Sequence, residues 1–208
     1  RCFGTVGGEH AEGPLAASAK AFLVELLLRE EVSGKTRSEA IQEYKTLLRD
    51  YPQSPNARRA EWRIADLYFE QGAFQEAQAF YENAMAHSVN LPFDGNRALL
   101  GLGYTFMAMR KWSDAGHAFA NVRKRSEDEQ LLQGATLGLA HALFSEQRFS
   151  DAQPIYNLSY QRWPQLLRSD PLLLQGYAVS QVKLHQEVSA RELMLLFYNL
   201  YPRHEYAP

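Results

Sequence analysis

The stretch that decides the fold is "AEWRIADLYFEQGAFQEAQAFYENAMAH", which runs from Ala60 to His87. Two runs of helix-favouring residues flank the short turn "EQGAF", and apolar residues recur three and four positions apart in both runs. This spacing predicts two α-helices that pack against each other as a helical hairpin. One hairpin cannot bury its whole apolar face, so the pattern also predicts neighbouring hairpins stacked against it.

The same pattern returns at five places along the chain. Each has a small residue followed four positions later by a large, usually aromatic one. The small residues are Ala40, Ala77, Ala115, Ala152 and Ala190, and the large ones are Tyr44, Tyr81, Phe119, Tyr156 and Met194. Successive alanines are 37, 38, 37 and 38 residues apart. A near-constant period of this length is the signature of a repeat architecture.

Further positions keep the same register. A second set of small residues stands twelve positions before the alanine, at Ala65, Gly103, Ala140 and Ala178. Prolines stand twelve positions after it, at Pro52, Pro164 and Pro202, where we expect them to end the second helix of a hairpin. Small residues let two helices approach closely, and the aromatic side chain then fills the wedge between one hairpin and the next.

The chain is therefore predicted to be all-α, without a sheet. Residues 1–15, rich in glycine, are predicted to form an extended lead-in. Five hairpins are predicted at about residues 16–55, 56–93, 94–129, 130–168 and 169–202.

The pattern of small residue, aromatic turn, alanine, aromatic and proline resembles the tetratricopeptide repeat over about residues 16–202. The resemblance implies a right-handed superhelix, an α-solenoid, that serves as a non-enzymatic interaction scaffold. The family period is about 34 residues, and this one is three or four residues longer. The turn glycine of the family is present as Gly72 but is replaced by Arg110, Gln147 and His185.

A shorter resemblance concerns the cellular location. The phrase "YPQSPNARRA", from Tyr51 to Ala60, is similar to the variant found in bacterial cell-envelope members of the family. It favours a periplasmic or cell-envelope protein, with the cytoplasm as the alternative.

In this family the first helix of each hairpin lines a concave groove that binds a peptide or protein segment. Carried over by pattern, the resemblance gives nine groove residues: Arg59, Trp62, Asp66, Arg97, Tyr104, Met107, His141, Phe144 and Lys183. Trp62 could equally well pack between hairpins, and Leu100, Leu137 and Val179 are interpreted as core. The slots that hold Trp62 and Asp66 do not match the subclass that clamps a terminal carboxylate.

Other functions find little support. A net charge of -2 offers no field for nucleic acid. No pair of the six histidines lies four residues apart, and no Cys/His cluster is present, so we expect no metal or other cofactor. "SGKT" at Ser33 lacks the glycine that a phosphate loop needs at position 29, and no GxSxG motif occurs, so no enzyme is expected.

The charged segment "RKRSEDE" runs from Arg123 to Glu129. It is interpreted as the end of one helix and the start of the next, rather than as a nucleic-acid-binding patch, because basic residues favour the end of a helix and acidic residues its start.

The most apolar window, Ala21 to Glu30, is too short to cross a bilayer and contains Glu25, so it is predicted to be a buried helix. The segment "ELMLLFYNLYP", from Glu192 to Pro202, is apolar around most of its circumference. It predicts a chain cut from a longer array, in which the helix at 190–201 is an interface for a further repeat or for a second copy. Two alternatives stay open: a self-associating structural module, and a regulatory segment of a larger enzyme.

Overall fold

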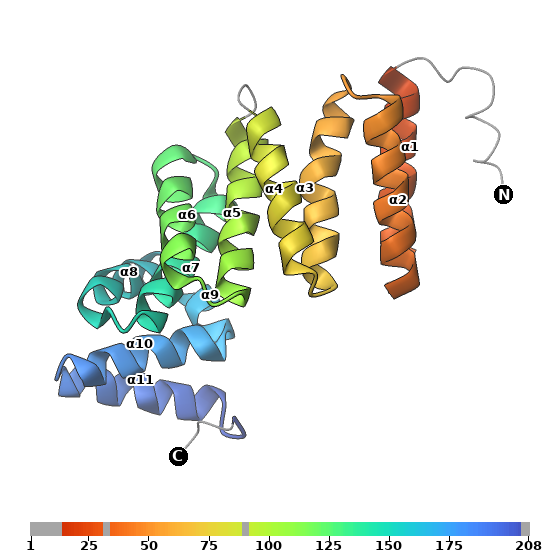
Figure 1. The fold of residues 1–208 in the computed structure, drawn as a ribbon. Coiled ribbons are helices and arrows are strands. Elements are labelled where there is room, and N and C mark those ends of the chain that lie inside the picture. Colours follow the sequence, from red (N-terminus) through yellow and green to blue (C-terminus); the bar gives the residue numbers. More distant parts are fainter. Residues whose placement is uncertain (1–13, 31–33, 89–91, 205–208) are drawn as a thin grey trace. The chain divides into compact units, whose positions relative to one another are not determined.

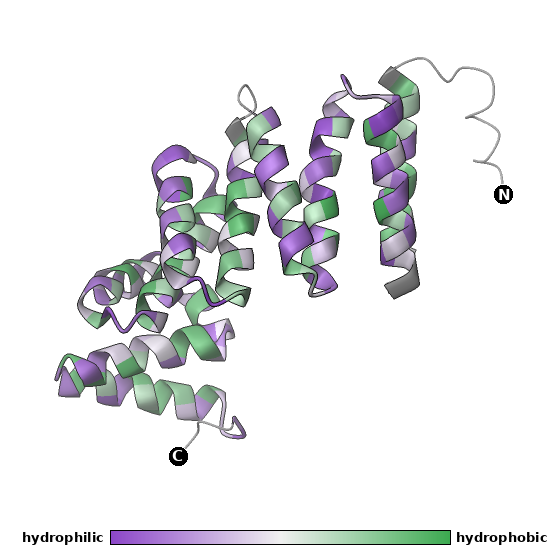
Figure 2. Cartoon of the chain, viewed as in Figure 1, coloured by the Kyte–Doolittle hydropathy of each residue, from purple (hydrophilic) through white to green (hydrophobic). Residues whose placement is uncertain are grey.

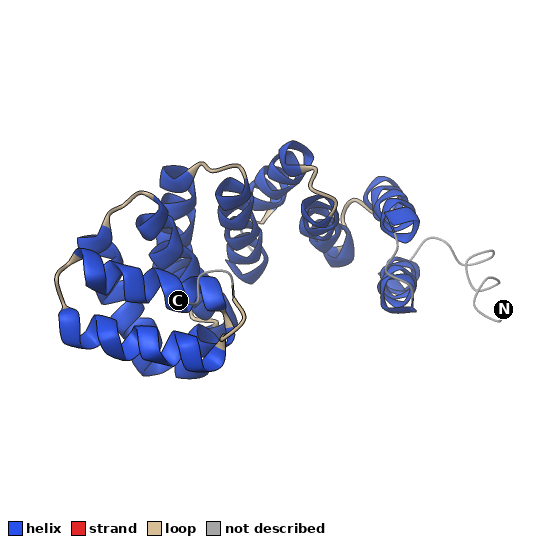
Figure 3. Ribbon diagram, turned by 90° about the horizontal axis from the view of Figure 1, so that it is seen from below, coloured by secondary structure: helices blue, strands red, loops and turns tan. Residues whose placement is uncertain are grey.

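The structure is a computed structural model, and it describes residues 14–30, 34–88 and 92–204. Within these ranges every regular element is an α-helix (Figure 1, Figure 3). The helices are α1 (Pro14–Glu30), α2 (Gly34–Asp50), α3 (Pro55–Glu70), α4 (Phe74–His87), α5 (Pro92–Ala108), α6 (Trp112–Arg125), α7 (Glu129–Ser145), α8 (Phe149–Arg162), α9 (Pro164–Ser169), α10 (Pro171–Lys183) and α11 (Glu187–Leu200). The prediction of an all-α chain is confirmed.

The chain divides into two compact units, residues 1–105 (unit 1) and 106–208 (unit 2), and the boundary falls within α5. In unit 1, α1 packs on α2, α2 on α3, and α3 on α4. In unit 2, α6 packs on α7, α7 on α8, α8 on α10, and α10 on α11. Each unit therefore contains contacts within hairpins and contacts from the second helix of one hairpin to the first helix of the next.

The turns inside four hairpins share one backbone conformation. Their central residues have φ between 57° and 75°, in the left-handed region: Gly72, Arg110, Gln147 and His185. At the first of these turns the Gly72 N–H donates to the Phe69 carbonyl at 3.0 Å, and the Ala73 N–H donates to the Tyr68 carbonyl at 2.9 Å. The other three turns repeat this pair of bonds, which together cap the carbonyl end of the first helix. The three turns that lack the glycine therefore keep the same backbone conformation as the turn at Gly72.

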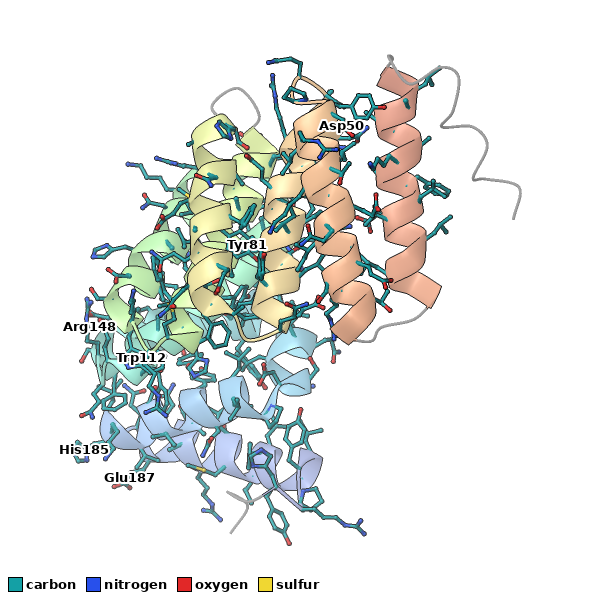
Figure 4. The ribbon with its side chains drawn as sticks, turned by 45° about the vertical axis from the view of Figure 1, so that its right-hand side comes forward. Asp50, Tyr81, Trp112, Arg148, His185 and Glu187 are labelled. Carbon is teal, nitrogen blue, oxygen red and sulfur yellow. The ribbon has the colours of Figure 1, made fainter. Side chains whose placement is uncertain are left out.

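Between hairpins, an aromatic side chain lies against a glycine of the next helix. Tyr81 on α4 (Figure 4) meets Gly101 on α5. A Cβ placed on Gly138 would lie 2.6 Å from Phe119 Cζ, and one on Gly176 would lie 2.5 Å from the Tyr156 hydroxyl oxygen. These aromatics are almost fully buried, so the wedge position predicted for them is confirmed. The glycines that receive them were not identified from the sequence.

The ends of helices agree with several sequence signals. Helix α6 ends in Arg123, Lys124 and Arg125, and Asp128 caps α7 by accepting a hydrogen bond from the Leu131 N–H at 2.9 Å. Pro52, Pro164 and Pro202 follow the ends of α2, α8 and α11 by two residues. The interpretations of "RKRSEDE" and of the prolines are therefore correct. Pro164 additionally opens the short helix α9, which the sequence did not predict.

Helix α1 differs from its prediction in two ways. It begins at Pro14, inside the range predicted to be extended, because proline at the first position of a helix already has the required φ. Among its described side chains, Ala17 and Val24 are buried, while Leu15 and Phe22 are exposed. The predicted burial therefore holds for one face of this helix and not for the face that carries Phe22. Residues 1–13, which include Cys2 and most of the predicted lead-in, lie outside the described residues.

No helix in the described part of the chain is both long and apolar enough to span a bilayer. At α11, Ala190, Leu193 and Phe197 are buried, and Met194, Leu195 and Tyr198 are exposed. Figure 2 shows hydrophobic residues, coloured green, in α11, where the sequence has the apolar run from Leu193 to Phe197.

Candidate functional site

Unit 1 contains a groove of about 590 Å³ that is lined by α1, α2, α3 and α5. Its lining includes Ser18, Phe22 and Glu25 from α1, Asn56, Arg59, Trp62 and Arg63 from α3, and Phe93 and Asp94 from α5. Three of the contributing helices are the first helices of successive hairpins. The resemblance to the family implied a groove lined by first helices, and most of the residues that line this one were not among the nine predicted.

Trp62 is half-buried and lies beside two guanidinium groups. Those of Arg63 and Arg97 lie 4.8 Å and 5.1 Å from the centre of its ring. A cation over an aromatic ring is attracted by the electrons of its face. The tryptophan is therefore held in place by cations from α3 and α5, and it both packs against neighbouring helices and lines the groove.

Asp66 is engaged inside the unit rather than pointing freely to solvent. Its Oδ2 accepts a hydrogen bond from Arg97 at 2.8 Å, and its Oδ1 accepts one from the Tyr81 hydroxyl. Burial raises the pKa of Asp66, while the charge of Arg97 and the Tyr81 hydrogen bond act in the opposite direction. These contacts fix Arg97 beside Trp62 and tie α3 to α4 and α5.

A second polar cluster ties α1 to α2 and α3. Glu25 accepts hydrogen bonds from the Tyr44 hydroxyl at 2.6 Å and from Arg63 at 2.9 Å. Arg63 occupies the place in α3 that Gly101, Gly138 and Gly176 occupy in later helices, nine residues before the turn residue. The sequence contained a signal for this cluster, because Glu25 is an acidic residue within an apolar window and such a residue needs a polar partner when its helix is packed.

Arg59 and Asp94 form the outermost charged pair of the groove. Their Nε and Oδ1 atoms are 3.6 Å apart, which is too long for a hydrogen bond, and the Arg59 side chain is 59% exposed. Asp94 is buried. The pair leaves most of the guanidinium of Arg59 available to a ligand in the groove.

The nine predicted groove residues divide between the two units. Unit 1 holds Arg59, Trp62, Asp66, Arg97 and Tyr104; the first four lie together as described, and Tyr104 is exposed on α5. Unit 2 holds Met107, His141, Phe144 and Lys183. There the His141 and Phe144 rings are 6.4 Å apart, and Lys183 is exposed at the end of α10. Of the three residues interpreted as core, Leu100 is buried, and Leu137 and Val179 are half-buried.

Among the described residues, no three His, Cys, Asp or Glu side chains gather closely enough to hold a metal ion. The charged groups of the groove instead form ion pairs and hydrogen bonds with one another. This arrangement can bind a ligand by contact and hydrogen bonding.

A protein-family model described as tetratricopeptide repeat matches residues 33–86 and 100–166 of the chain. Among curated proteins, no sequence matches it.

Solved structures with similar folds include three tetratricopeptide-type proteins. One, from a study described as functional characterization of Pseudomonas aeruginosa pilF, has a TM-score of 0.75 at 20% identity, over 92% of this chain and 79% of that one. YrrB, described as a TPR protein with an unusual peptide-binding site, has a TM-score of 0.70 at 15% identity, over 100% of this chain and 96% of that one. A tetratricopeptide repeat protein from Parabacteroides merdae has a TM-score of 0.66 at 17% identity, over 95% and 70%. At these identities the likeness concerns the fold alone.

Proposed function

Because the chain belongs to the tetratricopeptide repeat family, whose members are typically non-enzymatic scaffolds, we propose that it binds a protein segment in the groove of unit 1. The observation that carries this proposal is a pair of exposed phenylalanines, Phe22 on α1 and Phe93 on α5. Their side chains are 61% and 52% exposed, and both line the groove. Exposed aromatic side chains that gather with arginine in a concavity are typical of binding sites.

A selection with displayed random peptides tests this function directly. Peptides selected on the wild-type chain should bind a Phe22→Ser, Phe93→Ser variant about ten-fold more weakly or worse, because the variant loses the apolar walls. The matched control is Leu15→Ser, which removes an exposed apolar side chain from the same helix α1 but outside the groove. If the selected peptides bind all three proteins equally, the groove is not the binding site.

The other predicted groove residues remain part of the proposal. We infer that Tyr104 in unit 1 and Met107, His141, Phe144 and Lys183 in unit 2 also contact partner segments. Phe144→Ala should then weaken the binding of segments that contact unit 2, and it should leave the binding of short peptides in the unit 1 groove unchanged.

A second function is favoured by the exposed apolar face of α11: self-association. Met194 is 38% exposed, whereas Tyr81, Phe119 and Tyr156 at the same place in earlier hairpins are at most 2% exposed. On α8, Tyr156 and Tyr160 pack against Tyr177 of the following helix, at 5.4 Å and 6.0 Å between ring centres. We propose that the equivalent face of α11, with Met194 and Tyr198, contacts a second copy of the chain.

Light scattering over a concentration series tests this second function. The mass of the wild-type protein should rise with concentration, and a Met194→Lys, Tyr198→Lys variant should stay monomeric. Leu172→Lys, at an exposed leucine on α10, is the control that should still associate. A monomeric mass for the wild type at all concentrations would exclude the dimer.

We also propose that the scaffold acts in the bacterial cell envelope, on the basis of the phrase from Tyr51 to Ala60. Fractionation of the native organism should recover the protein with the periplasm or the envelope. Recovery in the cytoplasm alone would overturn this location.

A further inference from the structure

Two buried polar atoms of the groove lack a hydrogen-bond partner among the described residues: the Trp62 Nε1 donor and the Asp94 Oδ1 acceptor. Asp94 as a whole is 4% exposed, and its nearest cation, Arg59, stands at 3.6 Å. A buried polar group without a partner costs roughly 1–3 kcal/mol. The groove therefore carries one unused donor and one unused acceptor, both on residues that line it.

The pair of unused atoms limits the chemistry of the ligand. A carboxylate can only accept hydrogen bonds and an ammonium group can only donate them, so neither satisfies both atoms. A peptide main chain offers both an N–H and a carbonyl. The charged side chains that line the groove balance one another, Glu25 and Asp94 against Arg59 and Arg63. The lining therefore has no excess charge that would select a strongly acidic or basic segment.

The walls of the groove suit apolar side chains. Phe22 and Phe93 line the groove and are each more than half exposed, and covering such rings with an apolar group removes apolar surface from water. In an extended segment, successive side chains point to opposite faces, and each residue other than proline still offers a main-chain N–H and a carbonyl. The two kinds of contact can therefore be made by one strand of peptide.

We propose that the groove recognises an extended, apolar protein segment through its main chain. A peptide carbonyl of the segment accepts a hydrogen bond from Trp62 Nε1, a peptide N–H donates to Asp94 Oδ1, and an apolar side chain packs on Phe22 and Phe93. This inference rests on the proposed function and specifies its partner: a segment chosen for its apolar side chains and free main chain rather than for its charge.

The test uses the peptides selected on the wild-type chain, with each backbone amide N-methylated in turn. Methylation of one amide should weaken binding about ten-fold, because it removes the N–H that bonds to Asp94. On an Asp94→Leu variant the same methylation should have little further effect, since the acceptor is gone. A Trp62→Phe variant should likewise bind the unmodified peptide more weakly, because it lacks the indole N–H that donates to the carbonyl of the segment.

The outcomes separate this inference from the function on which it rests. If no selected peptide depends on Phe22 and Phe93, the proposed function fails and the inference falls with it. If peptides do depend on them but no amide is coupled to Asp94, or if replacing a charged side chain of the peptide has the dominant effect, the function stands and main-chain recognition is overturned. The methylation series on the wild-type protein identifies the amide that matters, and the Asp94→Leu variant then tests whether that amide is coupled to Asp94.

Discussion

At the scale of single residues, equivalent tyrosines in two hairpins have different surroundings. The hydroxyl of Tyr81 donates to Asp66, which is itself bound to Arg97. The hydroxyl of Tyr156 is buried and has no hydrogen-bond partner in the described part of the chain. Phenylalanine occupies the same position in the intervening hairpin, as Phe119. The ring is thus common to these three interfaces. At the same position in the first hairpin, the Tyr44 hydroxyl also donates to a carboxylate, that of Glu25, so the Tyr156 hydroxyl differs from both of the others.

Replacing each tyrosine by phenylalanine should therefore have opposite effects on stability. Tyr81→Phe should lower the free energy of unfolding by about 1.5–3 kcal/mol, because it removes a hydrogen bond to a buried carboxylate. Tyr156→Phe should leave stability unchanged or raise it by about 1 kcal/mol, because a buried hydroxyl without a partner disappears. Urea unfolding of both variants measures the difference. A larger loss for Tyr156→Phe than for Tyr81→Phe would contradict this account.

The turn residues allow a second comparison at this scale. A residue with a side chain costs about 1–2 kcal/mol in the left-handed region, where glycine is free of strain. Gln147→Gly should therefore raise stability by up to about 1 kcal/mol, after the entropy that glycine adds to the unfolded chain is subtracted. Gly72→Ala should lower it by about 1 kcal/mol, although a Cβ there would meet no atom within 4 Å. Thermal unfolding checks both signs, and a stabilised Gly72→Ala protein would refute the reasoning.

At the scale of helices, the contact of an aromatic with a glycine sets how closely two hairpins approach. Gly138→Ala should lower stability by about 1–3 kcal/mol, because its new methyl group would overlap the ring of Phe119. Gly116→Ala is the matched control in the neighbouring helix α6. Its Cβ would lie 3.9 Å from Leu139 Cδ1, an ordinary contact, so it should stabilise the helix by about 0.5–1 kcal/mol.

Chemical denaturation of the two glycine variants measures these changes. A double variant, Phe119→Leu with Gly138→Ala, should lose less than the sum of the two single changes, because the smaller side chain makes room for the methyl group. Additive losses would show that the strain of Gly138→Ala has another origin.

Most helices could be predicted from the sequence because the same pattern of small and aromatic residues, weak evidence in one hairpin, recurs in five. The alanines of the second helices recur five times, each with a large residue four positions later. This pattern predicts that both residues are buried, and in the first four hairpins they are. Gly101, Gly138 and Gly176 also recur with the same period, but in the sequence they read as weak points of a helix. Only the position of the facing aromatic ring reveals why no side chain fits there.

At the scale of the whole molecule, stability should depend on the protonation of His141. Burial lowers the pKa of His141, and the charge of Asp170 acts in the opposite direction. The unfolded chain then binds a proton more readily than the folded one as the pH falls below about 6.5, the ordinary pKa of histidine. The contribution of neutral His141 is therefore present above that pH and is lost as the pH falls towards the lower, folded-state pKa.

Unfolding of the full chain at neutral and mildly acidic pH tests this dependence. The wild type should lose more stability between the two conditions than His141→Gln, whose side chain does not titrate. His117→Gln, at an exposed histidine on α6, is the control that should retain the wild-type slope. Equal slopes for the wild type and His141→Gln would exclude His141 as the cause.

The sequence by itself determined the all-α class, the helical hairpins and the family, because these follow from the period of small, aromatic and helix-ending residues along the chain. It also indicated that the first helices would line a groove. Only the tertiary structure decided which residues form that groove. Phe22 and Glu25 lie far from Asp94 in the sequence, and none of the three belongs to a repeated pattern, so their meeting depends on how α1, α3 and α5 pack. The same packing left Trp62 Nε1 and Asp94 Oδ1 buried without partners, and a linear pattern of residue types does not encode which polar atoms remain unpaired.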